Sequence, residues 1–98
     1  MKLGVLVSDY KLTVDTLDRL KADKLGIILV LNGVYHATLK ENGKSSSVLD
    51  KTSNLYALSE DLQTRGIKDG DVDKRVKVVN YGELVDLMFN EYEKLAWL

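Results

Sequence analysis

The sequence offers few side chains that could do covalent chemistry. It contains no cysteine and a single histidine, His36. The missing thiol excludes disulfides, thiolate metal sites and any cysteine nucleophile. A histidine acts in acid–base catalysis when a second group orients or complements it, and the sequence nominates no such group. We therefore expect no catalytic residue, metal or cofactor, and chemistry based on His36 is a minor alternative.

A candidate ligand site follows an aliphatic run from Leu25 to Leu31. Asn32 and Gly33 come directly after the run, and His36 lies about one helical turn later. If the run is a strand of a parallel sheet, these residues lie at its carboxyl end, where open α/β sheets bind their ligands. The candidate ligand-binding residues are Asn32, Gly33 and His36. The alternative places His36 on a helix surface or in an interface, with no ligand.

Other polar motifs lack the spacing that their chemistry requires. Gly43-Lys44-Ser45 resembles the end of a phosphate loop, but the first glycine of that pattern is replaced by Thr38. The acidic stretch 69–73 has no glutamate that would close a calcium loop. Glu60 and Asp61 are neighbours in the first turn of an expected helix, so they diverge by about 100° and are expected to act as partners of the helix dipole.

Length and charge exclude several classes of function. The 98 residues suffice for one domain, 1–98, and 14 basic against 15 acidic residues give a net charge of -1. The charges are dispersed along the chain, so we expect no direct binding to nucleic acid. The longest apolar run, Leu25 to Leu31, is far shorter than the ~20 residues that span a bilayer, so we expect no membrane role.

Alternating aliphatic runs and helical patterns predict an α/β fold. Continuous aliphatic runs are typical of strands that are covered on both faces. We expect a three-layer open, mainly parallel sheet with helices on both faces. The expected strands are Leu3–Val7, Leu25–Leu31, Leu55–Leu58 and Val76–Val79. The expected helices are Thr13–Leu20 with Thr13 as its cap, Val34–Lys40, a helix capped by Ser59 and closed by Gly66, and a long C-terminal helix.

Two segments are expected to reach beyond this core. The polar stretch 41–54 is predicted to be a flexible loop. The C-terminal helix begins with a capping box, Asn80 with Glu83, and a hydrophobic staple, Val79 with Leu84. Its apolar stripe is wider than packing on one sheet requires, so we predict that the protein is at least a dimer. The expected interface residues are Tyr81, Leu87, Met88, Phe89, Tyr92 and Trp97.

Several segments together resemble one known family. They are Asn32-Gly33-Val34, Leu55–Leu62 with Arg65-Gly66, Val78–Tyr81 with Leu84–Leu87, and Ala96-Trp97. In this order and spacing they are similar to the TusB/DsrH sulfur-relay subunits of the DsrE/DsrF/DsrH superfamily. The resemblance implies a DsrE-like fold, association with itself or with DsrE/DsrF-type subunits, and cytoplasmic sulfur transfer toward tRNA 2-thiouridine synthesis or sulfur oxidation.

The absence of cysteine restricts what this resemblance implies. A persulfide relay needs a thiolate to accept the sulfur, and this chain has none. The first hypothesis is therefore a non-catalytic subunit that assembles or regulates cysteine-bearing partners. The alternative is a stand-alone homo-oligomeric module that binds a small anion or metabolite near Asn32, Gly33 and His36.

Overall fold

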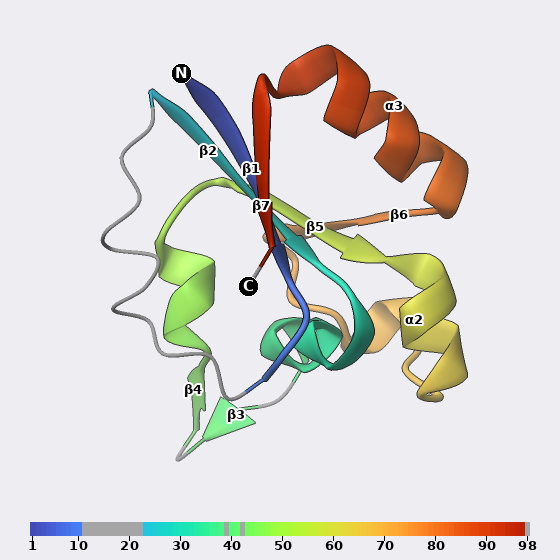
Figure 1. Cartoon of the computed structure of the whole chain (residues 1–98). Helices are drawn as coiled ribbons and strands as arrows, with labels where there is room; N and C mark the ends of the chain where they lie inside the picture. The colour runs from blue at the N-terminus through green and yellow to red at the C-terminus, as the bar shows by residue number, and fades with distance from the viewer. Residues whose placement is uncertain (11–22, 39, 42, 98) are drawn as a thin grey trace.

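Five strands form one all-parallel sheet in the order β6-β5-β2-β1-β7 (Figure 1). This computed structural model describes residues 1–10, 23–38, 40–41 and 43–97. The expected α/β architecture with a parallel sheet is confirmed. A second, two-stranded antiparallel sheet pairs β3 (Lys40–Glu41) with β4 (Lys44–Ser45). The strands of the main sheet are β1 (Lys2–Val7), β2 (Lys24–Leu29), β5 (Asn54–Leu58), β6 (Val76–Val79) and β7 (Lys94–Trp97).

The helices are short except for the last one. The predicted helix Thr13–Leu20 lies outside the described residues. The helix expected at Val34–Lys40 is a 3-10 helix that begins and ends three residues earlier, at Leu31 and Ala37. The helical elements are η1 (Leu31–Ala37), η2 (Ser47–Asp50), α2 (Ser59–Thr64), η3 (Asp69–Asp71) and α3 (Tyr81–Glu91).

The sheet is buried on both faces because its side chains alternate between two hydrophobic clusters. On the first face, Val5 and Ile27 pack with Val34 of η1 and Leu62 of α2. Residues of η2 belong to the same cluster. On the second face, strand residues pack with Leu84 of α3. These strand residues are Leu6, Ile28, Leu58 and Val79. Helices therefore cover both faces and give the three expected layers.

Among the elements that the structure describes, α3 is the only helix on the second face. The connections from β2 to β5 and from β5 to β6 carry η1, η2 and α2 over the first face. The connection from β6 to β7 runs back across the whole sheet, and right-handed crossing places its helix on the opposite side. A helix is about 10 Å wide, whereas five strands span ~19 Å. Part of the second face is therefore left without a helical cover.

The expected long C-terminal helix is wrong beyond residue 91. Helix α3 ends at Glu91, Tyr92 has extended backbone angles, and Lys94–Trp97 forms β7, a fifth strand beside β1. The spacing of Tyr92, Leu95 and Ala96 matched a helical repeat. It equally fits a strand, in which Ala96 packs on the first face and Leu95 lies on the second. Pairing with β1 supplies the backbone hydrogen bonds that a longer helix would have made internally.

The turn into β7 is fixed by Tyr92, whose ring lies against two glycines. Gly4 of β1 and Gly26 of β2 are register partners in the sheet. A Cβ atom at Gly26 would lie 1.9 Å from the Tyr92 hydroxyl, and one at Gly4 would lie 3.2 Å from its Cγ atom. The ring thus occupies space that only glycine leaves open. Tyr92 is 7% exposed and belongs to the interior of the chain, which corrects its expected place in an intermolecular interface.

Two local predictions for the remaining segments are confirmed, and one is wrong. The capping box of Asn80 and Glu83 is present, and Gly66 has a positive φ of 69°. The expected cap at Ser59 is wrong, because Ser59 is the first residue of α2 and its hydroxyl donates to Glu60 at 2.8 Å.

The flexibility of 41–54 stays a prediction. Any motion there has to leave Val48 and Leu49 of η2 in the core.

The packing of Tyr92 on the glycines predicts a large effect of one methyl group. Gly26→Ala should lower the free energy of unfolding by roughly 1 to 3 kcal/mol, because the added Cβ has to displace the Tyr92 ring. Gly70→Ala is the matched control, because a Cβ there meets nothing within 4 Å and its φ is not positive. Urea denaturation of both variants measures the difference, and equal stabilities would contradict this packing.

Candidate functional site

The structure places Asn32 and Gly33 at the carboxyl edge of the sheet, where they join η1 to its neighbours. The Asn32 Oδ1 atom accepts hydrogen bonds from Arg65 Nε at 3.1 Å and from Nη2 at 2.9 Å. Gly33 packs so closely on β1 that a Cβ would lie 1.9 Å from the Val7 carbonyl oxygen. Both residues therefore hold the carboxyl ends of β1 and β2 against α2. Their role in binding a ligand stays a prediction.

The two acids of α2 hold other segments at the same edge. The Asp61 Oδ2 atom accepts from the Leu31 amide at 2.7 Å, and the Glu60 Oε2 atom accepts from the Tyr81 amide at 3.0 Å. Hydrogen bonds from the Ser59 hydroxyl and from the Tyr81 amide lower the pKa of Glu60. Leu31 has a φ of 50°, which is costly for a side chain of this size, and the Asp61 carboxylate stabilises it there.

These acids therefore do more than the helix-dipole role expected from sequence. Their partners lie 30 and 21 positions away in the chain, at the beginnings of η1 and α3. Local spacing carries no information about such contacts. A catalytic pairing of the two carboxylates is not formed, because each one binds a different backbone amide.

His36 is a buried residue with a partner for each ring nitrogen, so it does not lie on a helix surface, and its role in binding a ligand stays a prediction. Its side chain is 3% exposed. Nε2 lies 3.0 Å from the Asp9 carbonyl oxygen, and Nδ1 lies 2.7 Å from Ser46 Oγ. A carbonyl only accepts, so Nε2 carries the proton and the Ser46 hydroxyl donates to Nδ1. Burial lowers the pKa of His36 and favours this neutral form.

The burial of His36 predicts that stability decreases in mild acid. The pKa of folded His36 lies below its ordinary value of 6.5, so the unfolded chain binds the proton first as the pH falls. The free energy of unfolding should therefore decrease below about pH 6.5, by at most ~1.4 kcal/mol per pH unit. Urea denaturation from about pH 7.5 to 5.5 measures the slope.

His36→Asn removes the titrating group and is the control for this effect. The chain has no other histidine, so the variant should be less stable at neutral pH and should lose the slope between about pH 6.5 and 5.5. A parent and a variant with the same slope would show that other groups carry the pH dependence.

Four large apolar side chains of α3 and β7 are exposed. Tyr81 and Phe89 of α3 are 63% and 83% exposed. In β7, Trp97 is 63% exposed, and Leu95 is 45% exposed. Trp97 pairs in register with Leu6, a residue of the second face, and its indole Nε1 donates to Ser8 Oγ at 3.2 Å. We call Tyr81, Phe89, Leu95 and Trp97 the aromatic surface.

The other expected interface residues are less accessible. Leu87 and Met88 are half-buried and pack against the second-face cluster, and Tyr92 is interior. Of the expected interface residues, Tyr81, Phe89 and Trp97 are exposed, and Leu95, which was not expected there, is exposed as well. Sequence periodicity missed Leu95 as a surface residue because the helix that it predicted turned this side chain into the apolar stripe. A role of these residues in association stays a prediction.

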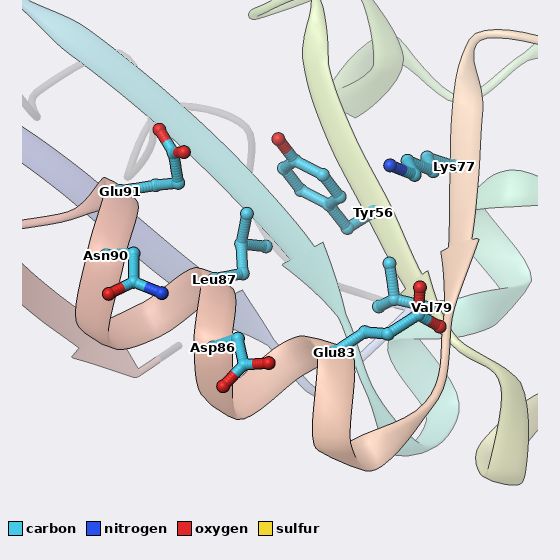
Figure 2. A pocket seen from close by; sticks show the side chains of 8 residues that line it. All are labelled: Tyr56, Lys77, Val79, Glu83, Asp86, Leu87, Asn90 and Glu91. Carbon is cyan, nitrogen blue, oxygen red and sulfur yellow. The ribbon is translucent and has the colours of Figure 1, made fainter.

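A groove of about 270 Å³ opens on the other side of α3, between this helix and strands β5 and β6 (Figure 2). Tyr56 and Val79 lie at its base, and Lys77 lies on the strand side. Sequence reasoning did not predict this groove. The periodic acids and amide of α3 were visible, but nothing local showed that the helix would leave β6 partly uncovered.

Residues 1–10, 23–38, 40–41 and 43–97 lack two further classes of site. This part of the chain holds no group of three or more histidine, cysteine, aspartate or glutamate side chains that could bind a metal ion. It also contains no helix with the length and apolar character needed to cross a membrane.

The fold defines a small α/β protein with an all-parallel main sheet, exposed aromatic side chains and no thiol. The chain matches the family described as DsrH like protein over residues 7–94. It belongs to this DsrH-like family, and the resemblance found in the sequence is confirmed.

Individual relatives match almost the whole chain. Protein TusB of Photorhabdus laumondii subsp. laumondii is 30% identical over 90 residues, which cover 92% of this chain and 93% of that protein. Protein TusB of Yersinia pestis and Protein TusB of Yersinia pseudotuberculosis give the same identity and the same coverage. Membership of this family supports a role as a sulfur-relay subunit.

Proposed function

We propose that this protein is a non-catalytic subunit of a cytoplasmic sulfur-relay complex, in which it assembles cysteine-bearing partners of the DsrE/DsrF type. The relay would serve tRNA 2-thiouridine synthesis or sulfur oxidation. The observation that carries the proposal is the aromatic surface on a DsrH-like chain that has no thiol of its own. Such a chain contributes to sulfur transfer through contacts and not through a covalent intermediate.

The missing thiol supports the non-catalytic part of the proposal. Sulfane sulfur is transferred by attack of a thiolate, through an intermediate that contains a sulfur–sulfur bond. Neither a serine nor a histidine of this chain can form that bond in its place. His36, the group best suited to proton transfer, is neutral, buried and hydrogen-bonded on both nitrogens.

The aromatic surface supports the assembly part. Aromatic residues are enriched at the buried centres of protein interfaces, and a few of them carry most of the binding energy. Phe89, at 83% exposed, leaves almost its whole ring in water in the single chain. A partner that covers Phe89 and Trp97 would remove a large apolar area from solvent, at about 25 cal/mol per Å².

The proposal predicts that one charge on the aromatic surface prevents assembly. Phe89→Glu should weaken binding to a co-expressed cysteine-bearing DsrE/DsrF-type subunit by ~2 kcal/mol or more, roughly thirtyfold, because the aromatic anchor is lost and a carboxylate is buried. Gln63→Glu, which adds the same charge on an exposed position of α2, is the matched control. Affinity from titration calorimetry and the helical circular dichroism signal are measured for both variants.

Self-association through the same surface is tested by light scattering over a concentration series. A parent chain that forms a dimer and a Phe89→Glu variant that stays monomeric would support association of identical chains. If Phe89→Glu binds every such partner as tightly as the parent and leaves the oligomeric state unchanged, the aromatic surface has no role in assembly.

The proposal also predicts that the chain accepts no sulfur. Incubation with a persulfide-charged cysteine desulfurase should leave its mass unchanged, because the nucleophile is absent and not merely covered. A cysteine-bearing partner in the same reaction serves as the positive control and should gain sulfur. A stable adduct of one sulfur atom on this chain, seen by mass spectrometry, would refute the non-catalytic role.

A further inference from the structure

We propose that the groove between α3 and β6 binds the guanidinium group of an arginine side chain that a partner subunit presents. The inference deepens the proposed function and rests on it for the source of the arginine. It concerns a different surface from the aromatic one. Both surfaces lie beside α3, but they are on opposite flanks of this helix.

The helix side of the groove follows the helical repeat. The five α3 residues that line the groove follow one another at intervals of three, one, three and one positions. This spacing places them on one stripe of the helix. At about 100° per residue, Tyr81 and Phe89 lie ~130° to 150° around the helix from the centre of that stripe. The groove can therefore be occupied while the aromatic surface is covered by another protein. The residues of the stripe are Glu83, Asp86, Leu87, Asn90 and Glu91.

The groove carries more negative than positive charge, and one carboxylate has no partner. Among the described residues that line it, Lys77 is the only cation, against Glu83, Asp86 and Glu91. Glu83 accepts from the Asn80 amide at 3.0 Å, and Glu91 pairs with Lys24 at 3.0 Å. Asp86 forms no hydrogen bond or ion pair within the part of the chain that the structure describes. This charge pattern fits a cation and disfavours an anion.

The base of the groove suits the planar, partly apolar side chain of arginine. Tyr56 is half-buried and turns its ring into the groove, beside Val79 and Leu87 (Figure 2). An arginine can lay its methylene stem along the aliphatic groups and place its guanidinium against the aromatic ring. The guanidinium then offers donors to Asp86 and to the Asn90 amide oxygen on the wall.

A buried hydroxyl without a partner points toward the same base. Tyr92 is 7% exposed, and its hydroxyl has no hydrogen-bond partner among the described residues. Its ring runs from Gly4 of β1, next to Cγ, to Gly26 of β2, next to the hydroxyl. The hydroxyl therefore points on toward β5, where Tyr56 is the second-face residue at the base of the groove.

The Tyr92 hydroxyl stays uncharged behind the base of the groove. Burial, together with the neighbouring Tyr56, raises the pKa of Tyr92, so the phenol stays protonated and uncharged. Tyr92 does not itself line the groove, and Tyr56 is a neighbour of its hydroxyl, so a donor-rich ligand at the base of the groove meets Tyr56 and acts on Tyr92 through it. Lysine has three donors at one point, whereas the planar arginine head spreads five donors over several acceptors.

The test uses the isolated ¹⁵N-labelled chain and N-acetyl-arginine amide as the probe. Saturable shifts are expected for the backbone amides of 83–91 and of Tyr56, and for the side-chain amide of Asn90. The citrulline analogue, a neutral isostere, should cause no saturable shift. Asp86→Asn should weaken binding of the arginine probe at least about fivefold, whereas Asp69→Asn, an exposed acid on η3, should leave it unchanged.

Three results would overturn the inference. The first is equal binding of the arginine and citrulline probes. The second is an equal effect of Asp86→Asn and Asp69→Asn, which would indicate only diffuse charge attraction. The third is free L-arginine binding at least tenfold more tightly than the blocked probe, which would indicate a site for the amino acid itself. These titrations need no partner, so their failure is distinct from a failure of Phe89→Glu to prevent assembly.

Discussion

The second face of the sheet depends on one helix for its cover, and this constraint shapes the exposed surfaces described above. The order β6-β5-β2-β1-β7 sends the chain across the sheet in one direction and returns it in a single step. That step carries only the eleven residues of α3. The helix is narrower than the sheet, so a groove opens between α3 and strands β5 and β6, and Trp97 of β7 stays exposed.

The second face is partly uncovered, whereas the carboxyl edge of the sheet is closed by the chain itself. This edge is where α/β proteins commonly bind ligands. Here the chain uses its own polar groups to connect strand ends. The acids of α2 accept amides from η1 and α3, Arg65 donates to Asn32, and His36 connects the segments that contain Asp9 and Ser46. An edge organised in this way is well suited to rigidity. The exposed aromatic side chains and the groove therefore lie on α3 and β7 or beside them, and not in the usual crevice.

Sequence reasoning succeeded where a signature was local and failed where contacts were distant. The aliphatic runs predicted four of the five main strands, and Asn80 with Glu83 marked the beginning of α3 correctly. The fifth strand was missed because Tyr92, Leu95 and Ala96 fit both periods, and only pairing with β1 decides between them. The burial of His36 was missed for a similar reason, because Asp9 and Ser46 lie 27 and 10 positions away.

The pairing of β1 with β7 also has a consequence for how the chain is made. The Lys2 amide donates to the side chain of Glu93, 91 positions later, and the Glu93 amide returns a bond to Lys2. During synthesis, β1 therefore exists long before its outer neighbour, with one row of backbone donors and acceptors open. Closing so distant a contact is slow compared with local folding. The nascent chain thus passes through a stage in which β1 is an open sheet edge, and its two glycines still lack the tyrosine that covers them.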